Sequence, residues 1–432
     1  MDFLIEDILA REILDSRGNP TVEVEVTLGC GITARASVPS GASTGSREAV
    51  ELRDGDDARF GGKGVLNAVQ LINTEVLEAI VGLDSRDQAL IDRIMIELDG
   101  TENKSRLGAN GILGVSLAVA RASAMTADIP LYQYLGGVGA NLLPVPCMNI
   151  LNGGVHARWQ GPDFQEYMIA PYGAKNFRQA VQWGSEVYHA LRQVLLESDY
   201  SVGVGDEGGF APAVKSNREP LELIVKGIER AGLKPGVDVG ICMDPASSEF
   251  YENGKYKLRS ENRELTSAEM IEYYEKLVED FPVVLLEDGL AEDDWDNWPL
   301  LNEKLGGKIE IVGDDLLVTN TKYIQKAIEM NAANSALIKL NQIGSLTETI
   351  EAIQMCHHAA WGAFVSHRSG ETTDSFIADM TVALRTGHLK TGAPCRGERV
   401  EKYNQLMRIE DELGSMAVFA GRKVHSLIHQ YT

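Results

Sequence analysis

Cysteine is scarce in this chain of 432 residues. The five cysteines form no Cys-x-x-Cys pair and no close cluster, and they stand at positions 30, 147, 242, 356 and 395. An odd, scattered set of thiols argues against a disulfide framework and against a cysteine-ligated zinc site. The composition therefore fits a reducing compartment, and we predict a cytoplasmic location.

Long apolar runs and an excess of basic residues are also missing. No uncharged apolar segment approaches the roughly 18 residues of a membrane span, and the amino-terminal MDFLIEDILARE lacks the basic-then-apolar plan of a signal peptide. The formal net charge of -23 would repel phosphate groups. We therefore expect no membrane span and no nucleic-acid partner. The acidic side chains either keep the protein soluble or gather to hold cations, and composition alone does not choose between these two explanations.

Two different patterns divide the chain, as its length leads us to expect. Two strand patterns and then three helical patterns cover residues 3–10, 21–28, 65–80, 84–98 and 109–127. A short linker pattern follows at 141–144. The sequence predicts a smaller α+β domain over residues 1–140 and a second domain over residues 141–432.

The second domain alternates short apolar runs with helix-like stretches such as 267–280, 345–359 and 374–385. Continuous apolar runs suit strands that are buried on both faces, as in a parallel sheet. Several runs end in a polar residue, and a TIM-type barrel carries its active site at the carboxyl ends of its strands. A doubly wound sheet gives a similar alternation, but no Gly-x-Gly-x-x-Gly lies at a first strand–helix turn to support it. We therefore predict an α/β fold with a TIM-type (β/α)8 barrel behind the α+β domain.

Three acids close three successive apolar runs: Asp244 in VGICMD, Glu287 in VVLLED and Asp314 in IEIVGD. If these strands are neighbours in a barrel, their carboxylates converge and a divalent cation is the natural counter-charge. Oxygen-only ligands favour a hard ion such as magnesium. Any one acid alone is better explained as a helix cap or a solvated side chain, and only the threefold recurrence favours a metal site.

Two lysines lie at similar strand ends, Lys339 in SALIK and Lys390 in LKTG. A lysine at the end of an apolar strand is costly unless it is paired or functional. Near a dication and a second lysine, the pKa of Lys339 should fall toward that of a useful base. An ion pair with one of the acids is an equally good interpretation of either lysine.

Glycine-rich loops supply further candidates. Glu207 lies in GVGVGDEGGFAP, where it is either a proton donor or a turn residue that caps nearby amides. Gln165 and Glu166 lie in FQEYMI, and strand alternation points at most one of them inward. His156 follows a glycine pair on a loop, and a lone histidine is more often structural than catalytic.

The run GAFVSHRSG ends in Ser366, His367, Arg368 and Ser369. An arginine, hydroxyl groups and free backbone amides together make an anion cradle, and arginine binds phosphate in a bidentate manner. An arginine that caps strand carbonyls is the simpler alternative. The helix that follows favours the anion site.

Together these motifs resemble the enolase family, and the resemblance covers essentially the whole chain. It is carried, in one shared order, by LDSRGNPTVEVEV, VPSGASTG, LGANGILGVSLA, MNILNGGVHA, GDEGGFAP, LEDGLAEDDW, GDDLLVTN, IKLNQIGSLTET, SHRSGET and KYNQLMRIE. The resemblance implies an enolase-like ββαα(βα)6 barrel and a phosphopyruvate hydratase, a glycolytic lyase that interconverts 2-phosphoglycerate and phosphoenolpyruvate. It also implies one or two Mg²⁺ per site, of which we expect two, and a homodimer whose further assembly stays open.

The resemblance also implies roles for individual residues. Asp244, Glu287 and Asp314 match the ligands of a first magnesium, and Ser43 lies in a loop that closes over the substrate and helps to hold a second one. Lys339 matches the base and Glu207 the acid. The substrate contacts match His156, Gln165, Glu166, Glu287, Asp314, Ser366, His367, Arg368, Ser369 and Lys390. In the expected dimer, Arg11 would pair with Glu398 of the partner subunit.

One segment departs from the family pattern. Between His156 and Gln165 the chain reads ARWQGPDF, one residue longer than the usual spacing, and it includes the bulky Trp159. Two alternatives therefore remain: a paralogue that acts on another 2-substituted carboxylic acid, and a binding protein that keeps the fold. The anion cradle opposes an unphosphorylated substrate, and the intact acid–base pair opposes a purely non-catalytic role.

Overall fold

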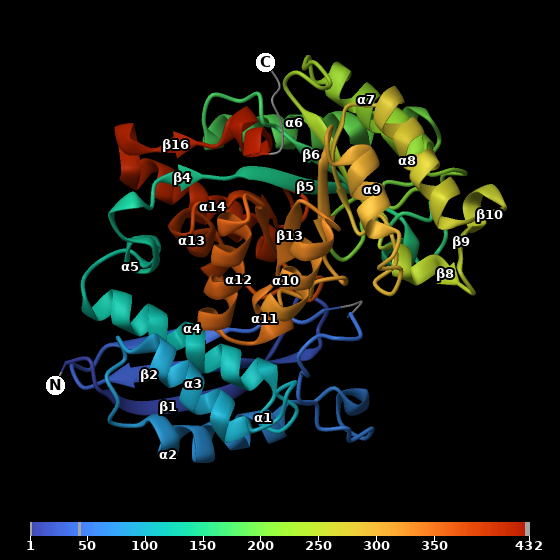
Figure 1. Cartoon of the computed structure of the whole chain (residues 1–432). Helices are drawn as coiled ribbons and strands as arrows, with labels where there is room; N and C mark the ends of the chain where they lie inside the picture. The colour runs from blue at the N-terminus through green and yellow to red at the C-terminus, as the bar shows by residue number, and fades with distance from the viewer. Residues whose placement is uncertain (1, 42–44, 428–432) are drawn as a thin grey trace.

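The computed structural model describes residues 2–41 and 45–427. An amino-terminal domain, blue in Figure 1, packs against one end of an α/β barrel. The predicted fold class is confirmed: the second part of the chain is a closed barrel of eight strands. Ser43, predicted as a magnesium ligand, lies outside the described residues.

The amino-terminal domain is built on a three-stranded antiparallel sheet of β1 (Ile5–Leu14), β2 (Pro20–Leu28) and β3 (Thr33–Ser37). In β2, alternate valines from Val22 to Val26 are fully buried, because one face of the sheet packs on a helix. That helix, α4 (Ala109–Thr126), lies on β2 and β3. Gly114 permits the close approach, since a Cβ there would stand 2.7 Å from a methyl group of Val24.

Shorter helices complete this domain. The predicted helix over 65–80 is α1 (Leu66–Leu71) and α2 (Leu77–Ile80), joined by the π-helical turn η2 (Ile72–Val76), and the next are α3 (Gln88–Asp99) and α5 (Leu131–Gly136). Among the described residues, no single helix has both the length and the apolar character needed to cross a membrane. One bent pair, Ala109–Thr126 with Leu131–Gly139, meets that test by length and composition.

The barrel strands follow the closed order β11-β12-β13-β14-β15-β5-β6-β7. Their bounds are β5 (Val145–Asn152), β6 (Glu166–Ala170), β7 (Gly240–Asp244), β11 (Val283–Glu287), β12 (Glu310–Gly313), β13 (Ser335–Ile338), β14 (Gly362–Ser366) and β15 (Gly387–Lys390). All eight residues of β5 are buried, as the continuous apolar run predicts. Side chains from seven of the strands pack together inside the barrel, among them Met168, Leu285 and Phe364.

The barrel sheet is parallel except at β6, which runs antiparallel to both β5 and β7, in keeping with the ββαα(βα)6 order that the resemblance implies. Residues 153–165 join β5 to β6 with only the short 3-10 turn η4 (Gly154–Ala157), and a parallel return needs a longer crossover, usually a helix. The reversal has a functional consequence. The first residue of β6, Glu166, pairs with the last residues of its neighbours, Asn152 and Asp244, and so lies on the rim where the other strands end.

Helices cover the outside of the barrel: α6 (Phe177–Glu197), α7 (Glu219–Arg230), α8 (Ser267–Asp280), α9 (Trp298–Leu305), α10 (Thr321–Met330), α12 (Leu346–His358), α13 (Phe376–Ala383) and α14 (Gly397–Leu413). The short α11 (Leu340–Ile343) lies instead at the pocket end of the barrel, against α4. The start of α8 is fixed by a reciprocal cap between Thr266 and Glu269. A small outer sheet is formed by β8 (Tyr251–Glu252), β9 (Lys255–Leu258) and β10 (Arg263–Leu265), and β4 (Leu142–Leu143) pairs with β16 (Val418–Phe419).

The amino-terminal domain meets the mouth of the barrel through backbone hydrogen bonds, among them a bridge between Ser40 and Gly370. Ser40 and Gly370 exchange hydrogen bonds of 2.8 and 2.9 Å between their backbone N–H and carbonyl groups. The bridge holds residues 38–41 beside the segment that follows β14. Side chains that follow residue 44, such as Glu48, are thereby brought to the polar end of the barrel.

Candidate active site

A polar pocket lies at the carboxyl ends of the barrel strands. Its lining residues are His156, Gln165, Glu166, Glu207, Asp244, Ala246, Asp288, Asp314, Asp315, Lys339, Ser366, His367, Arg368, Ser369 and Lys390. All of the predicted site residues that the structure describes are in this set except Glu287. Glu287 is fully buried and is linked to the pocket through Lys390.

The three predicted metal ligands stand on neighbouring strands, because β11 lies between β7 and β12. The ammonium nitrogen of Lys390 is 3.0 Å from Asp244 Oδ2 and 2.8 Å from Glu287 Oε1. The third acid, Asp314, forms an ion pair with Lys339. Both lysines therefore take the ion-pair positions that the sequence left as an alternative to a functional role.

The chemistry of this donor set fits a hard dication. Burial, and then the charge of Asp244, raises the pKa of Glu287 well above its ordinary value. Buried oxygen ligands that repel one another in this way would be relieved by a cation such as Mg²⁺. Asp244, Glu287 and Asp314 are the residues that would hold it.

A second group of acids, Asp288, Asp314 and Asp315, has carboxylate oxygens within 4.8 Å of one another. Asp288 accepts hydrogen bonds of 2.8 and 3.0 Å from the backbone N–H groups of Asp314 and Asp315. Its carboxylate therefore caps the end of β12 and is poorly placed to bind a metal. Sequence analysis missed this role, although the adjacent acids in GDDLLVTN and LEDG are a visible signal.

The protein surroundings alone raise the pKa of Lys339, and the fall that we predict beside a dication stays a prediction. Burial lowers the pKa, and so do the charges of Arg368 and Lys390, but the carboxylate of Asp314 outweighs them and the pKa is raised. The physical reason is the direct ion pair between Asp314 and the ammonium group. This ion pair favours the ammonium form of Lys339.

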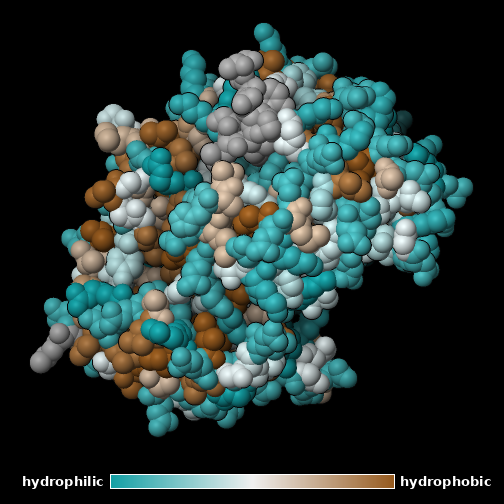
Figure 2. Space-filling model, in the orientation of Figure 1, coloured by the Kyte–Doolittle hydropathy of each residue, from teal (hydrophilic) through white to brown (hydrophobic). Residues whose placement is uncertain are grey.

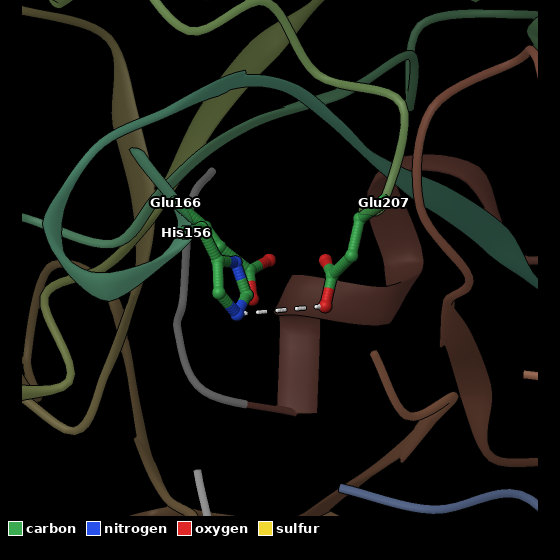
Figure 3. Close-up of side chains that lie close together, drawn as sticks. All are labelled: His156, Glu166 and Glu207. Atoms are coloured by element: carbon green, nitrogen blue, oxygen red, sulfur yellow. Dashed lines mark ion pairs between the residues drawn. The ribbon is translucent and has the colours of Figure 1, made fainter. Parts of the chain in front are cut away.

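Across the pocket, Glu207 meets His156 and Glu166 (Figure 3). Its carboxylate accepts hydrogen bonds of 3.0 Å from both the Asn149 amide and the Ser369 hydroxyl, and His156 Nε2 lies 4.0 Å away. Glu207 therefore contacts Ser369 and His156, which line the pocket, and is more than a turn cap.

The two glutamates differ in their affinity for a proton. Burial, and then the charge of Glu207, raises the pKa of Glu166 well above its ordinary value. Burial also opposes ionisation of Glu207, but His367 and His156 outweigh it and lower its pKa well below the ordinary range. Without substrate, the pair thus holds a proton on Glu166 and a charge on Glu207.

The expectation that at most one of Gln165 and Glu166 faces inward is wrong. Both side chains line the pocket, and both residues are buried. Strand alternation does not apply to this pair, because β6 begins at Glu166 and Gln165 still belongs to the preceding loop.

The predicted anion cradle is present but is filled by a carboxylate from the amino-terminal domain. Arg368 donates to Glu48 at 3.0 and 3.1 Å and to the Asn341 side-chain oxygen at 2.8 Å. Gln342 donates to Glu48 at 3.2 Å and to Asp314 at 2.8 Å. The side chain of Arg368 thus takes part in an acid-lined network and does not merely cap carbonyls. The hydroxyl of Ser366 bonds to the neighbouring carbonyl of His367.

Two family models match the chain. One, described as the enolase N-terminal domain, matches residues 5–135, and the other, the enolase C-terminal TIM barrel domain, matches residues 140–428. "Enolase 2" of Pseudomonas syringae pv. tomato is 65% identical over 417 residues, which are 96% of this chain and 98% of the relative. "Enolase 1" of Methanospirillum hungatei is 59% identical over 419 residues, 97% of this chain and 98% of that relative.

The chain belongs to the enolase family.

This membership confirms the predicted enzyme class, a phosphopyruvate hydratase among the lyases. Three residues of the site were missed by sequence analysis, although they lie in or near the family motifs. No apolar run ends at Glu48, Asn341 or Gln342, so strand-end reasoning passed over all three.

The longer loop of this enolase-family chain packs outward. The guanidinium of Arg259 stacks over the Trp159 ring at 4.4 Å, and Asp163 accepts a 2.8 Å hydrogen bond from the Arg259 backbone. Residues 157–164 therefore pack toward the outer sheet, and none of them lines the pocket. His156 still reaches to within 3.4 Å of the Ser369 hydroxyl.

Proposed function

We propose that this protein is a magnesium-dependent glycolytic enolase, which reversibly dehydrates 2-phosphoglycerate to phosphoenolpyruvate in the cytoplasm. One observation carries the proposal. Lys339 follows β13, and Glu166 opens β6, which is the strand opposite β13 in the closed barrel. The base, Lys339, therefore faces the two acids, Glu166 and Glu207, across one pocket, as an elimination requires.

The base has to remove a very weakly acidic proton, because it lies next to a carboxylate. Bound Mg²⁺, held by Asp244, Glu287 and Asp314 with help from the loop of Ser43 for the second ion, would supply the positive charge that makes this proton acidic enough. If Asp314 held the metal, its carboxylate would no longer favour the ammonium form of Lys339. Arg368 and Lys390 still lower the pKa of Lys339, so the neutral amine becomes accessible.

The acid has to protonate the departing hydroxyl group, since hydroxide is a poor leaving group. Glu166 holds the proton in the substrate-free site, and Glu207 is its neighbour across the pocket. An incoming substrate that carries a phosphate and a carboxylate adds negative charge, which favours protonation of Glu207. Glu207 then donates that proton to the hydroxyl group.

Binding uses the remaining walls of the pocket. Arg368 releases Glu48 and binds the substrate phosphate in a bidentate manner. Ser369 and His156 supply further hydrogen-bond donors to the phosphate. Lys390 pairs with the substrate carboxylate. Gln165, Ser366 and His367 complete the wall.

The test is formation of phosphoenolpyruvate from 2-phosphoglycerate, followed by its absorbance in the presence of magnesium or a chelator. We expect product with magnesium, little with the chelator and little from Lys339→Ala. A folded, magnesium-loaded protein that forms no product would overturn the proposal.

We further propose a homodimer in which the smaller domain, residues 1–140, carries much of the contact. Apolar side chains gather over this domain in Figure 2, and Leu9 and Leu14 of β1 are 47% and 58% exposed. Within one chain, Arg11 bonds Glu23 and Glu25, and Glu398 bonds Arg396. The expected pairing of Arg11 with Glu398 of the partner subunit would have to share these partners. Sedimentation of Glu398→Ala tests it, and unchanged dimer dissociation would refute that pair.

A further inference from the structure

Arg399, near the start of α14, has a fully buried guanidinium that none of the roles above uses. Its Nη1 donates to His367 Nδ1 at 2.6 Å and to the Arg368 carbonyl at 2.6 Å. Its Nη2 donates to the carbonyls of Ser369 at 2.6 Å and of Asp206 at 3.1 Å. One side chain thus connects the segment after β14 to the loop that carries Glu207.

The contact with His367 determines where the imidazole carries its hydrogen. A guanidinium has five donor N–H groups and no acceptor. His367 Nδ1 must therefore accept, so it has no hydrogen, and the single hydrogen of the neutral ring lies on Nε2. That nitrogen is 3.3 Å from Glu207 Oε2. The imidazole therefore holds its one N–H group 3.3 Å from the carboxyl that we assign as the acid, an ion-pair contact that lacks the geometry of a hydrogen bond.

The same contact opposes a second proton on the ring. A hydrogen on Nδ1 would point straight at the N–H of Arg399. Burial, together with the charge of Arg399, lowers the pKa of His367 to about 4, against the opposing charges of Glu207 and Glu371. These three charged groups surround the ring, and the imidazole stays neutral near pH 7.

A fixed donor at Glu207 has a defined chemical effect. An N–H dipole this close to the carboxylate stabilises the charged form, which makes the protonated glutamic acid a stronger acid. The acid therefore gives up its proton more readily when the hydroxyl group departs. A histidine that was free to rotate or to change tautomer would lose this effect.

We propose that Arg399 is a positioning residue that locks His367 as the Nε2–H tautomer and so aims a permanent donor at Glu207. The inference rests on the proposed function only for the role of Glu207. The tautomer itself is a property of the substrate-free protein and can be measured without any activity.

Lys402 provides a matched control on the same helix. It is also fully buried, and it braces the same segment through Glu371 Oε2 at 2.8 Å and the Thr372 carbonyl at 2.6 Å. Its third bond is to the carbonyl of Glu398, at 2.7 Å. These partners hold the backbone without touching the pair formed by His367 and Glu207.

The first experiment is a long-range proton–nitrogen correlation spectrum of the full-length protein with ¹⁵N-labelled histidine, in which His367→Asn assigns the ring. We expect a protonated Nε2 and an unprotonated Nδ1, with no titration between about pH 6 and about pH 8. A ring with hydrogen on Nδ1, or with two hydrogens near pH 7, would overturn the proposal. Neither result depends on turnover. A failure of this proposal can therefore be distinguished from a failure of the proposed function.

The second experiment compares variants. Arg399→Met should lower kcat by about tenfold or more with KM within about twofold, because the lost donor acts on the proton-transfer step. Arg399→Lys, which restores one donor, should recover part of the loss. Lys402→Met should lower the melting temperature but leave the His367 tautomer unchanged. In a Glu207→Gln background, Arg399→Met should cause little further loss of kcat.

Equal losses of kcat in Arg399→Met and Lys402→Met, with an unchanged tautomer in both, would show that Arg399 only braces the backbone. If Arg399→Met does not fold, the spectrum of the wild-type protein and the kinetics of Arg399→Lys still decide the matter.

Discussion

Lys390 lies with its ammonium nitrogen 2.8 and 2.9 Å from the two carboxylate oxygens of Glu287. The same nitrogen also binds Asp244 and lies 3.2 Å from Glu166 Oε2. One buried cation therefore neutralises two of the three predicted metal ligands. Lys390 and the expected metal ion would bind the same carboxylates. The stability of the site should therefore depend on the lysine and on the metal.

Replacement of Lys390 by methionine should make the stability of the protein depend on magnesium. Removal of one partner from a buried ion pair costs about 3–5 kcal/mol. Magnesium should restore part of this loss, so it should raise the melting temperature of Lys390→Met more than that of the wild type. The exposed Lys322→Met is the control. If neither magnesium nor a chelator changed the melting temperature of Lys390→Met, this result would argue against a metal on these acids.

Lys339 and Glu207 should act on different steps. Lys339→Ala should abolish exchange of the proton next to the substrate carboxylate with ²H₂O, a loss of about 100-fold or more. Glu207→Gln should retain this exchange while it forms phosphoenolpyruvate slowly, since the acid acts only after the proton has left. Mass spectrometry of recovered 2-phosphoglycerate measures both. Exchange that survived in Lys339→Ala would assign the base elsewhere.

Glu48 should compete with phosphate for Arg368. Its carboxylate occupies both terminal nitrogens of the guanidinium, so Glu48→Gln should strengthen inhibition by inorganic phosphate by about threefold or more. Glu12→Gln is the control, because Glu12 lies on β1 and pairs with Arg59 instead. A phosphate affinity that is the same in both variants would refute the competition.

Asp379 should give the folded protein a measurable pH dependence. Burial raises its pKa to about 7 from the ordinary 3.8. In this range the unfolded chain has released a proton that the folded chain keeps, so the contribution of Asp379 to stability falls as the pH rises from about 4 to about 7.

Asp379→Asn should therefore be more stable than the wild type near pH 8, by at most about 4 kcal/mol, and nearly equal to it near pH 4. Denaturant unfolding across this range measures the difference, with the exposed Asp411→Asn as control. A gain in stability that does not change with pH would contradict the shifted pKa.

Trp159 should affect the loop of His156 without changing the type of substrate. Its ring stacks on Arg259 outside the pocket, a contact worth roughly 0.5–1 kcal/mol. Trp159→Ala should raise KM by no more than about fivefold and leave unphosphorylated 2-hydroxy acids unreactive. Turnover of such acids at a rate comparable to that of 2-phosphoglycerate, by either the variant or the wild type, would favour the paralogue hypothesis.

Much of the site could be predicted because its residues stand at the ends of buried strands. Asp244, Glu287 and Lys390 are the last residues of apolar runs, and the carboxyl end of a barrel strand is the place where chemistry is found. Glu48, Asn341 and Gln342 give no such signal. Their importance comes from contacts with Arg368 and Asp314, which lie far away in the sequence.

The sequence by itself determined the two-part organisation, the barrel and the identities of the acids and bases, because periodicity and strand-end polarity are local properties of the chain. Only the tertiary structure decided which charges meet. The reversal of β6 places Glu166 beside Asp244, and closure of the barrel places Lys339 opposite Glu166. The packing of α14 brings Arg399 into contact with His367. Such pairings depend on distances of a few ångströms between segments that the chain connects only through its fold, and charge interactions change steeply over those distances.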